Sequence, residues 1–214
     1  MKVGVSILNS SNVKRDLELL SNTTCDYFHI DVMDKKFVTN KNDPYDILKC
    51  YENLYNKRLD IHLMCENPLP YINKYINLNT EFITIHIEIK EDIEKIINHI
   101  KEYGIKVGLA IKPSTDVRCI EPFLDDIDLV LLMSVEPGYG GQKFILSTER
   151  KIKELKDLIK NKNILISVDG GIDNLTKDFV QEADILVSGS YVLKGNYEER
   201  IESLKWKKYY LLYV

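Results

Sequence analysis

A short stretch from Tyr27 to Asp34 carries side chains that could perform chemistry. Its residues alternate in character with the period of a β-strand, in which positions two apart point to the same face. His29 and Asp31 therefore share a face with Tyr27 and Met33, whereas apolar residues occupy the other face. An imidazole and a carboxylate at this spacing can bind one metal ion together. The alternative is a hydrogen-bonded pair at the end of a strand.

Polar residues also occur late in other strand-like runs. The residues concerned are Ser6; Asp60, His62 and Met64; Thr84, His86 and Glu88; Met133; and Asp169. In a barrel of parallel strands, chemistry gathers at the carboxyl ends of the strands, so several polar ends on one rim predict a single site. We expect His86 to lie behind this site, or to be a satisfied histidine of the barrel interior, rather than to bind the metal.

Four of these residues form a candidate metal centre. His29, Asp31, His62 and Asp169 offer two imidazoles and two carboxylates, which suit a divalent ion such as Zn²⁺, Mn²⁺ or Fe²⁺. The ion would act as a Lewis acid on a carbonyl oxygen and stabilise an enediolate. Asp31 and Asp169 could stand on opposite faces of this planar intermediate, one removing a proton and the other returning one. The set therefore predicts inversion of a stereocentre.

Two kinds of residue are expected to complete the cavity. Met33, Met64 and Met133 would give a polarisable lining that does not titrate, although each could instead simply fill the barrel. Glycine-rich segments after the last three strands could bring backbone N–H groups close to a phosphate. They contain Gly138, Tyr139, Gly140 and Gly141; Gly170 and Gly171; and Gly189 and Ser190.

Strands must alternate with helices to position these residues. We expect strands at 3–8, 25–33, 59–64, 81–87, 106–111, 128–135, 164–169 and 184–188. Helices are expected to start at Asp43-Pro44, at Asn67-Pro68, near Ile93, at Ser147 and after Asp173–Thr176, with Gly104 ending the one near Ile93. Eight such units fit a closed (β/α)₈ TIM barrel, an α/β fold, as a single domain over residues 1–214.

Composition excludes several functional classes. The formal net charge of −4 argues against a nucleic-acid-binding protein, which would need a basic face. No apolar run is long enough to span a bilayer, and no cationic segment followed by an apolar run indicates a signal peptide. The four cysteines have no paired spacing, so we expect reduced thiols and a cytoplasmic location.

At these residues the chain resembles the ribulose-phosphate 3-epimerase family, and the resemblance runs along essentially the whole sequence. The matching segments are 5–8, 29–34 with Phe37, Val38 and Asn40, 60–64, Ile85 and His86, 132–135, 137–144, 168–172, and Gly189 with Ser190. The resemblance implies a cytoplasmic isomerase of the pentose phosphate pathway that interconverts D-ribulose 5-phosphate and D-xylulose 5-phosphate. It also implies one divalent ion per subunit (Zn, Mn, Fe or Co, with Zn preferred) and a homo-oligomer.

The family pattern assigns roles to the candidate residues. His29, Asp31, His62 and Asp169 would bind the metal, with Asp31 as proton acceptor and Asp169 as proton donor. Ser6 and His62 would touch the oxygens of the substrate. The remaining substrate contacts would come from Met33, Met64, Met133, Gly138, Tyr139, Gly140, Gly141, Gly170, Gly171, Gly189 and Ser190.

The sequence departs from the family pattern at Lys35, Thr39, Lys112, Ser114 and Glu136. A carboxylate beside a phosphate loop is unfavourable unless it points away, so we expect Glu136 to point outward. Two alternatives stay open, namely a 3-epimerase of a six-carbon ketose phosphate such as allulose 6-phosphate and a barrel that only binds sugar phosphates. The aromatic segment 206–214 could close the bottom of the barrel or cover a subunit contact.

Overall fold

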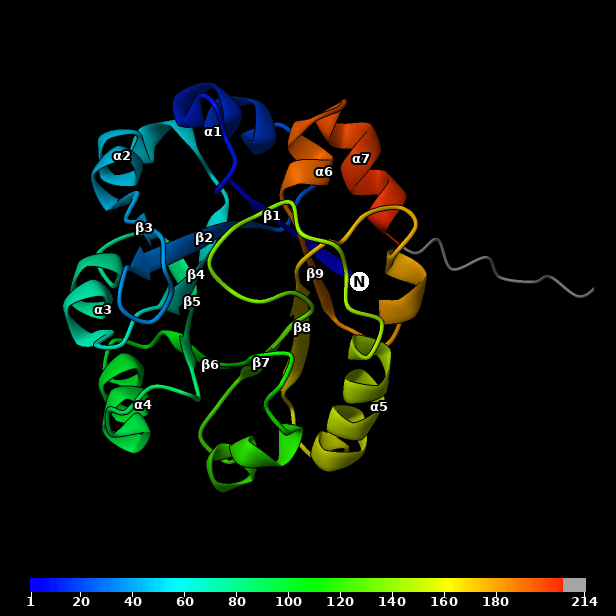
Figure 1. The fold of residues 1–214 in the computed structure, drawn as a ribbon. Coiled ribbons are helices and arrows are strands. Elements are labelled where there is room, and N and C mark those ends of the chain that lie inside the picture. Colours follow the sequence, from blue (N-terminus) through cyan, green and yellow to red (C-terminus); the bar gives the residue numbers. More distant parts are fainter. Residues whose placement is uncertain (206–214) are drawn as a thin grey trace, which may run out of the picture.

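A closed ring of eight parallel strands forms the centre of the computed structural model, which describes residues 1–205. The strands are β1 (Lys2–Ser6), β2 (Tyr27–Asp34), β4 (Arg58–Met64), β5 (Thr80–His86), β6 (Lys106–Ile111), β7 (Leu129–Met133), β8 (Leu165–Asp169) and β9 (Ile185–Ser188). The ring closes because β1 pairs with both β2 and β9. Figure 1 looks along the barrel, with helices around the ring. The predicted (β/α)₈ barrel is confirmed, and all eight expected strands are present.

Helices connect most of the strands on the outside of the ring. They are α1 (Val13–Ser21), α2 (Tyr45–Cys50), α3 (Leu69–Tyr75), α4 (Ile93–Lys101), α5 (Thr148–Ile159), α6 (Ser190–Leu193) and α7 (Tyr197–Leu204). As expected, α5 begins directly after Ser147, and Gly104 adopts a left-handed backbone just beyond α4. Pro44 and Pro68 come immediately before the first helical residue, one position earlier than predicted.

Two connections contain short 3-10 helices in place of the expected α-helices. These are η2 (Val117–Phe123) and η3 (Lys177–Val180), and a further turn, η1 (Glu52–Leu54), follows α2. Pro122 lies inside η2, where it has no N–H to donate to a regular helical ladder. Asp173 does cap the segment before η3, because its Oδ1 accepts hydrogen bonds from the backbone N–H groups of Leu175 and Thr176.

The strands present different residues to the two sides of the ring. Most of the large hydrophobic core lies between the strands and the helices and includes Ile30, Ile61 and Ile85. A second apolar cluster contains Tyr27 and Phe82, whose rings pack edge to face, and Leu131. The polar residues expected on the other strand face, including His29 and His62, are buried. The barrel therefore has an apolar lower part and a polar upper part.

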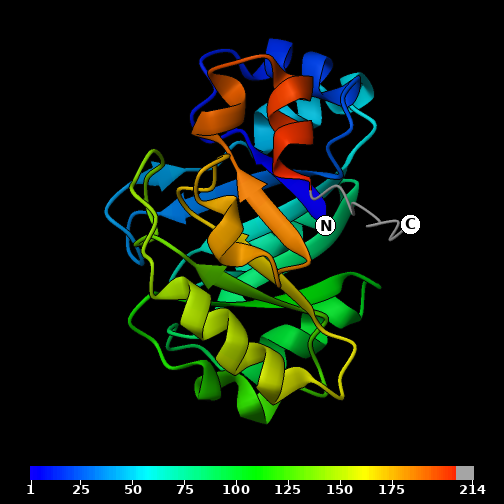
Figure 2. The same cartoon turned by 90° about the vertical axis from the view of Figure 1, so that its right-hand side faces the viewer.

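The loops at the carboxyl ends of the strands meet over the barrel mouth. In Figure 1 the long loop after β7 crosses in front of the ring, and Figure 2 shows this loop on the opposite side of the molecule from the N-terminus. Asn40, in the loop between β2 and β3 (Lys41–Asn42), donates a hydrogen bond from Nδ2 to the carbonyl oxygen of Gly138 at 2.8 Å. The unpredicted β3 pairs antiparallel with β2 and holds this loop in place.

Among the described residues, no helix is long and apolar enough to cross a membrane. The aromatic segment 206–214 lies outside the described residues. Assignment of residues 1–214 to one domain stays a prediction.

Candidate active site and metal centre

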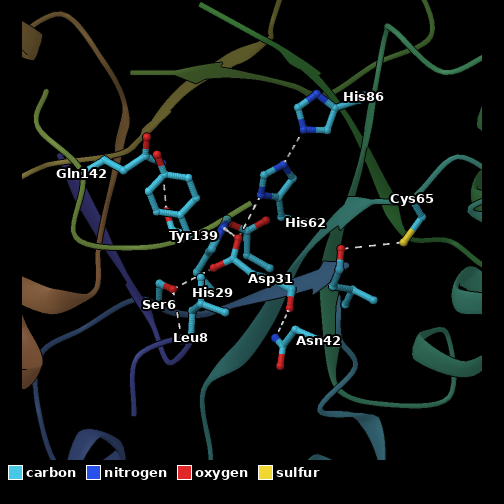
Figure 3. Close-up of polar contacts among 12 residues, drawn as sticks. Ser6, Leu8, His29, Asp31, Asn42, His62, Cys65, His86, Tyr139 and Gln142 are labelled. Carbon is cyan, nitrogen blue, oxygen red and sulfur yellow. Dashed lines mark hydrogen bonds and ion pairs between the residues drawn. The ribbon is translucent and has the colours of Figure 1, made fainter. Parts of the chain in front are cut away.

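The four residues of the candidate metal centre lie together inside the barrel, on three of its strands. His29 and Asp31 are on β2, His62 is on β4, and Asp169 is the last residue of β8. One possible ligand atom from each lies within 4.8 Å of the others. The register between β2 and β4 places Asp31 opposite His62, which explains why residues far apart in the sequence meet here. Figure 3 shows Asp31 between the two histidines.

Hydrogen bonds orient the two histidines differently. His29 Nδ1 lies 2.8 Å from Asp60 Oδ2, and the buried Nε2 faces Asp31 Oδ1 at 3.4 Å without forming a hydrogen bond among the described residues. His62 turns its Nδ1 toward the cluster, 3.1 Å from Asp31 Oδ1. A buried polar atom normally has a partner, and imidazole nitrogens with carboxylates are common ligands of divalent ions. His29 Nε2, which forms no hydrogen bond among the described residues, and its neighbours therefore fit a bound metal.

The two carboxyl groups of the cluster have opposite electrostatic environments. Burial raises the pKa of Asp169 to about 6, and the charge of Asp31 adds to this shift. Burial acts in the same direction on Asp31, but the adjacent His29 and His62 together hold the pKa of Asp31 below its ordinary value. Burial lowers the pKa of His29, whereas Asp60 and Asp31 together raise it well above its ordinary value. Two carboxyls with diverging pKa values are typical of an acid and base pair.

A cavity of about 520 Å³ opens above the cluster. This volume is within the range of small-molecule sites. Ser6, Asp31, Asp169 and all three candidate methionines line it, and Ser6 Oγ donates a hydrogen bond to Asp31 Oδ2 at 2.8 Å. His29 and His62 are fully buried and lie outside the cavity lining. The floor of the cavity is therefore made of carboxylates, a hydroxyl and thioethers.

Glycine-rich loops form the other side of the cavity. Its lining includes Gly138, Tyr139, Gly140, Gly141, Gly170, Gly171, Gly189 and Ser190. Gly171 has φ of +63°, and a Cβ there would lie 2.7 Å from the backbone nitrogen of Phe144 and 2.9 Å from the carbonyl oxygen of Gln142. This segment therefore requires glycine both for its backbone conformation and for the close approach of two loops.

The structure brings all the predicted site residues to one end of the barrel, either in the metal cluster or in the cavity lining. Tyr139 is 56% exposed, so its side chain is largely open to solvent. Glu136 is exposed, and its carbonyl oxygen accepts a hydrogen bond from Gln142 Nε2. His86 lies outside the four-residue cluster, in contact with His62, as predicted.

The sequence singled out Asp60 as a polar residue of the rim but not its contact with His29, and it missed two asparagines. Asp60 orients His29, Asn42 donates from Nδ2 to the carbonyl oxygen of Asp31, and Asn9 donates from Nδ2 to Ser190 Oγ. Asp60 was found from the strand pattern, because it precedes His62 by two residues and so shares its face. The two asparagines belong to loops or to the short β3, whose positions depend on the folded structure.

Comparison with known proteins identifies extensive similarity. The model of the ribulose-phosphate 3 epimerase family matches residues 2–193. A ribulose-phosphate 3-epimerase from Bacillus subtilis is 39% identical over 199 residues, which cover 90% of this chain and 92% of that protein. The chloroplastic ribulose-5-phosphate-3-epimerase of Arabidopsis thaliana is 34% identical, with 96% of this chain and 76% of that protein covered.

Solved structures show the same fold at low sequence identity. The 3-hexulose-6-phosphate synthase from Salmonella typhimurium aligns with a TM-score of 0.63 at 17% identity, covering 95% of this chain and 96% of that one. A tryptophan synthase structure from Mycobacterium tuberculosis aligns with a TM-score of 0.67 at 13% identity, covering 95% and 88%. At this level of identity the likeness concerns the fold alone.

Proposed function

This chain belongs to the ribulose-phosphate 3-epimerase family, and from this we propose that it inverts C3 of D-ribulose 5-phosphate to give D-xylulose 5-phosphate. The observation that carries the proposal is the pair of carboxyl groups, Asp31 and Asp169, whose pKa values diverge at the floor of one cavity. Epimerisation needs one group to remove a proton and another to return a proton to the opposite face. A protein that only binds sugar phosphates has no need of such a pair.

A divalent metal would be held by His29 through Nε2, by His62 through Nδ1, and by the carboxylates of Asp31 and Asp169. Bound there, Zn²⁺, Mn²⁺, Fe²⁺ or Co²⁺ would supply Lewis-acid stabilisation of negative charge on the substrate's oxygens. We prefer Zn²⁺ because the site combines imidazole nitrogens with carboxylate oxygens. The buried Asp60 fixes the orientation of His29 for this role.

The proton transfers fall to the two aspartates. Asp31, whose pKa is held low, is ionised and accepts the proton from C3. Asp169, whose pKa is raised to about 6, is the group that can hold a proton and return it to the other face of the planar enediolate. Ser6 steadies Asp31 through its hydrogen bond and lies in position to touch the substrate. Met33, Met64 and Met133 line the space around the intermediate and exclude water without titrating.

The phosphate group would bind on the glycine-rich side of the cavity. Gly141, Gly171 and Gly189 line this side, and without side chains they leave room for an anion near backbone N–H groups. Ser190 offers a hydroxyl beside them, and this hydroxyl is already held by Asn9. The carbon chain of the sugar would then extend from this side toward Asp31 and Asp169.

Solvent deuterium incorporation at C3 of ribulose 5-phosphate tests the proposal. We expect exchange together with turnover to xylulose 5-phosphate, and we expect both to disappear after chelation and in Asp31→Asn and Asp169→Asn. Absence of exchange in metal-loaded enzyme would overturn the five-carbon assignment, and allulose 6-phosphate would then be tested. Absence of exchange with both substrates would favour the barrel that only binds sugar phosphates.

A homo-oligomer and a cytoplasmic location are part of the same proposal. Light scattering coupled to size exclusion measures the first, and fractionation of cells measures the second. A monomer at enzyme concentrations used for assay would contradict the oligomer.

A further inference from the structure

A line of buried side chains continues from the candidate metal centre toward the outside of the barrel. His62 Nε2 lies 2.9 Å from His86 Nε2, and His86 Nδ1 lies 3.0 Å from Glu88 Oε2. Both histidines are fully buried, and Figure 3 shows His62 between Asp31 and His86. His86 ends β5, and Glu88 follows two residues later. Neither His86 nor Glu88 belongs to the four-residue cluster.

The direction of the hydrogen bonds along this line is set at Glu88. Its Oε1 accepts from the backbone N–H of Lys112 at 2.8 Å and from the hydroxyl of Thr115 at 2.5 Å. Its Oε2 is then the acceptor for His86, so His86 Nδ1 carries a proton and donates. A neutral His86 has no proton on Nε2, and this nitrogen accepts from His62. His62 therefore has its proton on Nε2, which leaves the lone pair of Nδ1 facing Asp31 and the cluster.

The groups that orient Glu88 are themselves held. The buried Lys151 on α5 donates from Nζ to the carbonyl oxygens of Lys112 and Thr115. On the other side, the ring of Phe37 packs against His86 with centroids 4.7 Å apart, and Lys112 Nζ lies 4.0 Å from the centre of the Phe37 ring. The loop after β6 thus fixes the carboxylate, and Phe37 covers the imidazole.

We propose that Glu88 is a positioning residue that acts through His86 to fix the tautomer of His62, so that Nδ1 is its metal-binding atom. This inference rests on the metal centre of the proposed function. The two histidines of that centre are oriented by different means, because Asp60 contacts His29 directly whereas Glu88 reaches His62 only through a second imidazole. A hydrogen bond to the free N–H of a metal-bound histidine fixes its ring and increases its basicity.

Glu88→Gln tests the direction of this line. The donors from Lys112 and Thr115 keep the amide oxygen at the Oε1 position, so the amide NH₂ must face His86. His86 would then accept at Nδ1 and donate from Nε2, and His62 would be forced to carry its proton on Nδ1. We expect the affinity for Zn²⁺ to fall by about 10- to 100-fold at a fixed pH, measured by competition with a chromophoric chelator in the absence of substrate.

Glu81→Gln is the matched control. Glu81 lies on β5, the strand that Glu88 follows, and its side chain is as exposed as that of Glu88 (19% each). It also forms ion pairs, but with Lys106 and Arg58 at the other end of the barrel. We expect its Zn²⁺ affinity to match that of the wild type. An equal loss of affinity in both variants would overturn the proposal, because the effect would then follow from lost charge alone.

Long-range ¹H–¹⁵N spectra of the histidine side chains provide a readout that does not need the variant to fold. In the zinc-loaded wild-type protein, we expect the proton of His62 on Nε2 and that of His86 on Nδ1. A proton on Nε2 of His86 together with coordination of His62 through Nε2 would overturn the proposal. The spectra and the Zn²⁺ affinity are independent of turnover, so failure of the deuterium experiment would reject the epimerase activity without affecting this result.

Discussion

The barrel mouth has two halves that are built in different ways. The histidine half consists of His29, Asp31 and His62, together with Asp60 and His86 behind them, and its side chains come from adjacent strands. The glycine half consists of residues 138–141, 170–171 and 189–190, which follow β7, β8 and β9. One half presents charged and titrating side chains held by buried hydrogen bonds. The other presents backbone held by tight turns.

This difference separates chemistry from positioning. Side-chain atoms on strands of a closed barrel are held rigidly by packing, which suits proton transfer at defined positions. Backbone N–H groups bind an anion without any titrating group, so they tolerate changes of pH. Asp169 joins the two halves, because it ends β8 and directly precedes Gly170. We therefore expect substitutions in the histidine half to reduce turnover, and those in the glycine half to affect substrate binding and folding.

The largest effect is expected for Asp31→Asn in the histidine half. The amide cannot accept the C3 proton and is a weaker metal ligand, so kcat should fall by about 10²- to 10⁴-fold, measured by coupled assay. Asp173→Asn, at the edge of the glycine half, is the control, since its Oδ1 accepts only backbone and hydroxyl hydrogen bonds that an amide oxygen can also accept. Comparable losses in both variants would remove the distinction between the halves.

Gly171→Ala should destabilise the glycine half. A methyl group there would clash with backbone atoms of Phe144 and Gln142 and would also hold φ at an unfavourable +63°, so we expect about 2–4 kcal/mol less stability by chemical denaturation. Gly104→Ala is matched in φ (+68°), but a Cβ there meets nothing within 4 Å. The control should therefore lose only about 1 kcal/mol. Equal losses would mean that backbone conformation, rather than loop approach, requires glycine.

The histidine half should make folding sensitive to acid. Burial lowers the pKa of His86 to about 4, against an ordinary value of 6.5, so the unfolded chain takes up a proton first as the pH falls. The stability contributed by the neutral ring is present above pH 6.5 and is lost as the pH falls toward 4.

The size of this effect is measurable against a variant. Between pH 6.5 and pH 4, the free energy of unfolding of the wild type should fall by about 2–3 kcal/mol more than that of His86→Gln, measured by chemical denaturation at each pH. If the free energy of unfolding fell equally with pH in the wild type and in His86→Gln, His86 would not be a buried neutral imidazole.

The smallest effect is expected for Glu136→Asn in the glycine half. Glu136 is exposed at the rim of the cavity, and its carbonyl oxygen accepts a hydrogen bond from Gln142 Nε2. We predict that its side chain points outward, so KM for the sugar phosphate should change by less than about twofold, within the range of surface substitutions. A clearly lower KM would indicate that the carboxylate faces the phosphate.

Strand alternation was sufficient to predict much of the architecture. It gave the eight strands and placed His29, Asp31 and His62 on the inner face, because a period of two determines the side on which a residue lies. It did not give the pairing of His29 with Asp60 or of His62 with His86, since these contacts depend on the register between neighbouring strands.

Loop structure was predicted less well. Lys35 shows why, because its backbone adopts φ of +65° where a small or polar residue is usual, and its N–H is held by the carbonyl oxygen of Asn40. The neighbouring β3 and the short 3-10 helices depend on such tertiary contacts. Lys112 lies over Phe37, which accounts for one departure from the family pattern, whereas nothing in the structure explains Thr39 or Ser114.

Closure of the ring affects how the chain can fold during synthesis. Lys2 pairs with Ile185 and Val5 with Ser188, so β1 has one unsatisfied edge until almost the whole chain has left the ribosome. The Gly4–Ser6 segment can pair earlier with β2, but its other side stays open to association with other chains. Asp169 also emerges late, on the strand that pairs with β9. A nascent chain therefore holds most of its candidate metal ligands well before it holds a closed barrel.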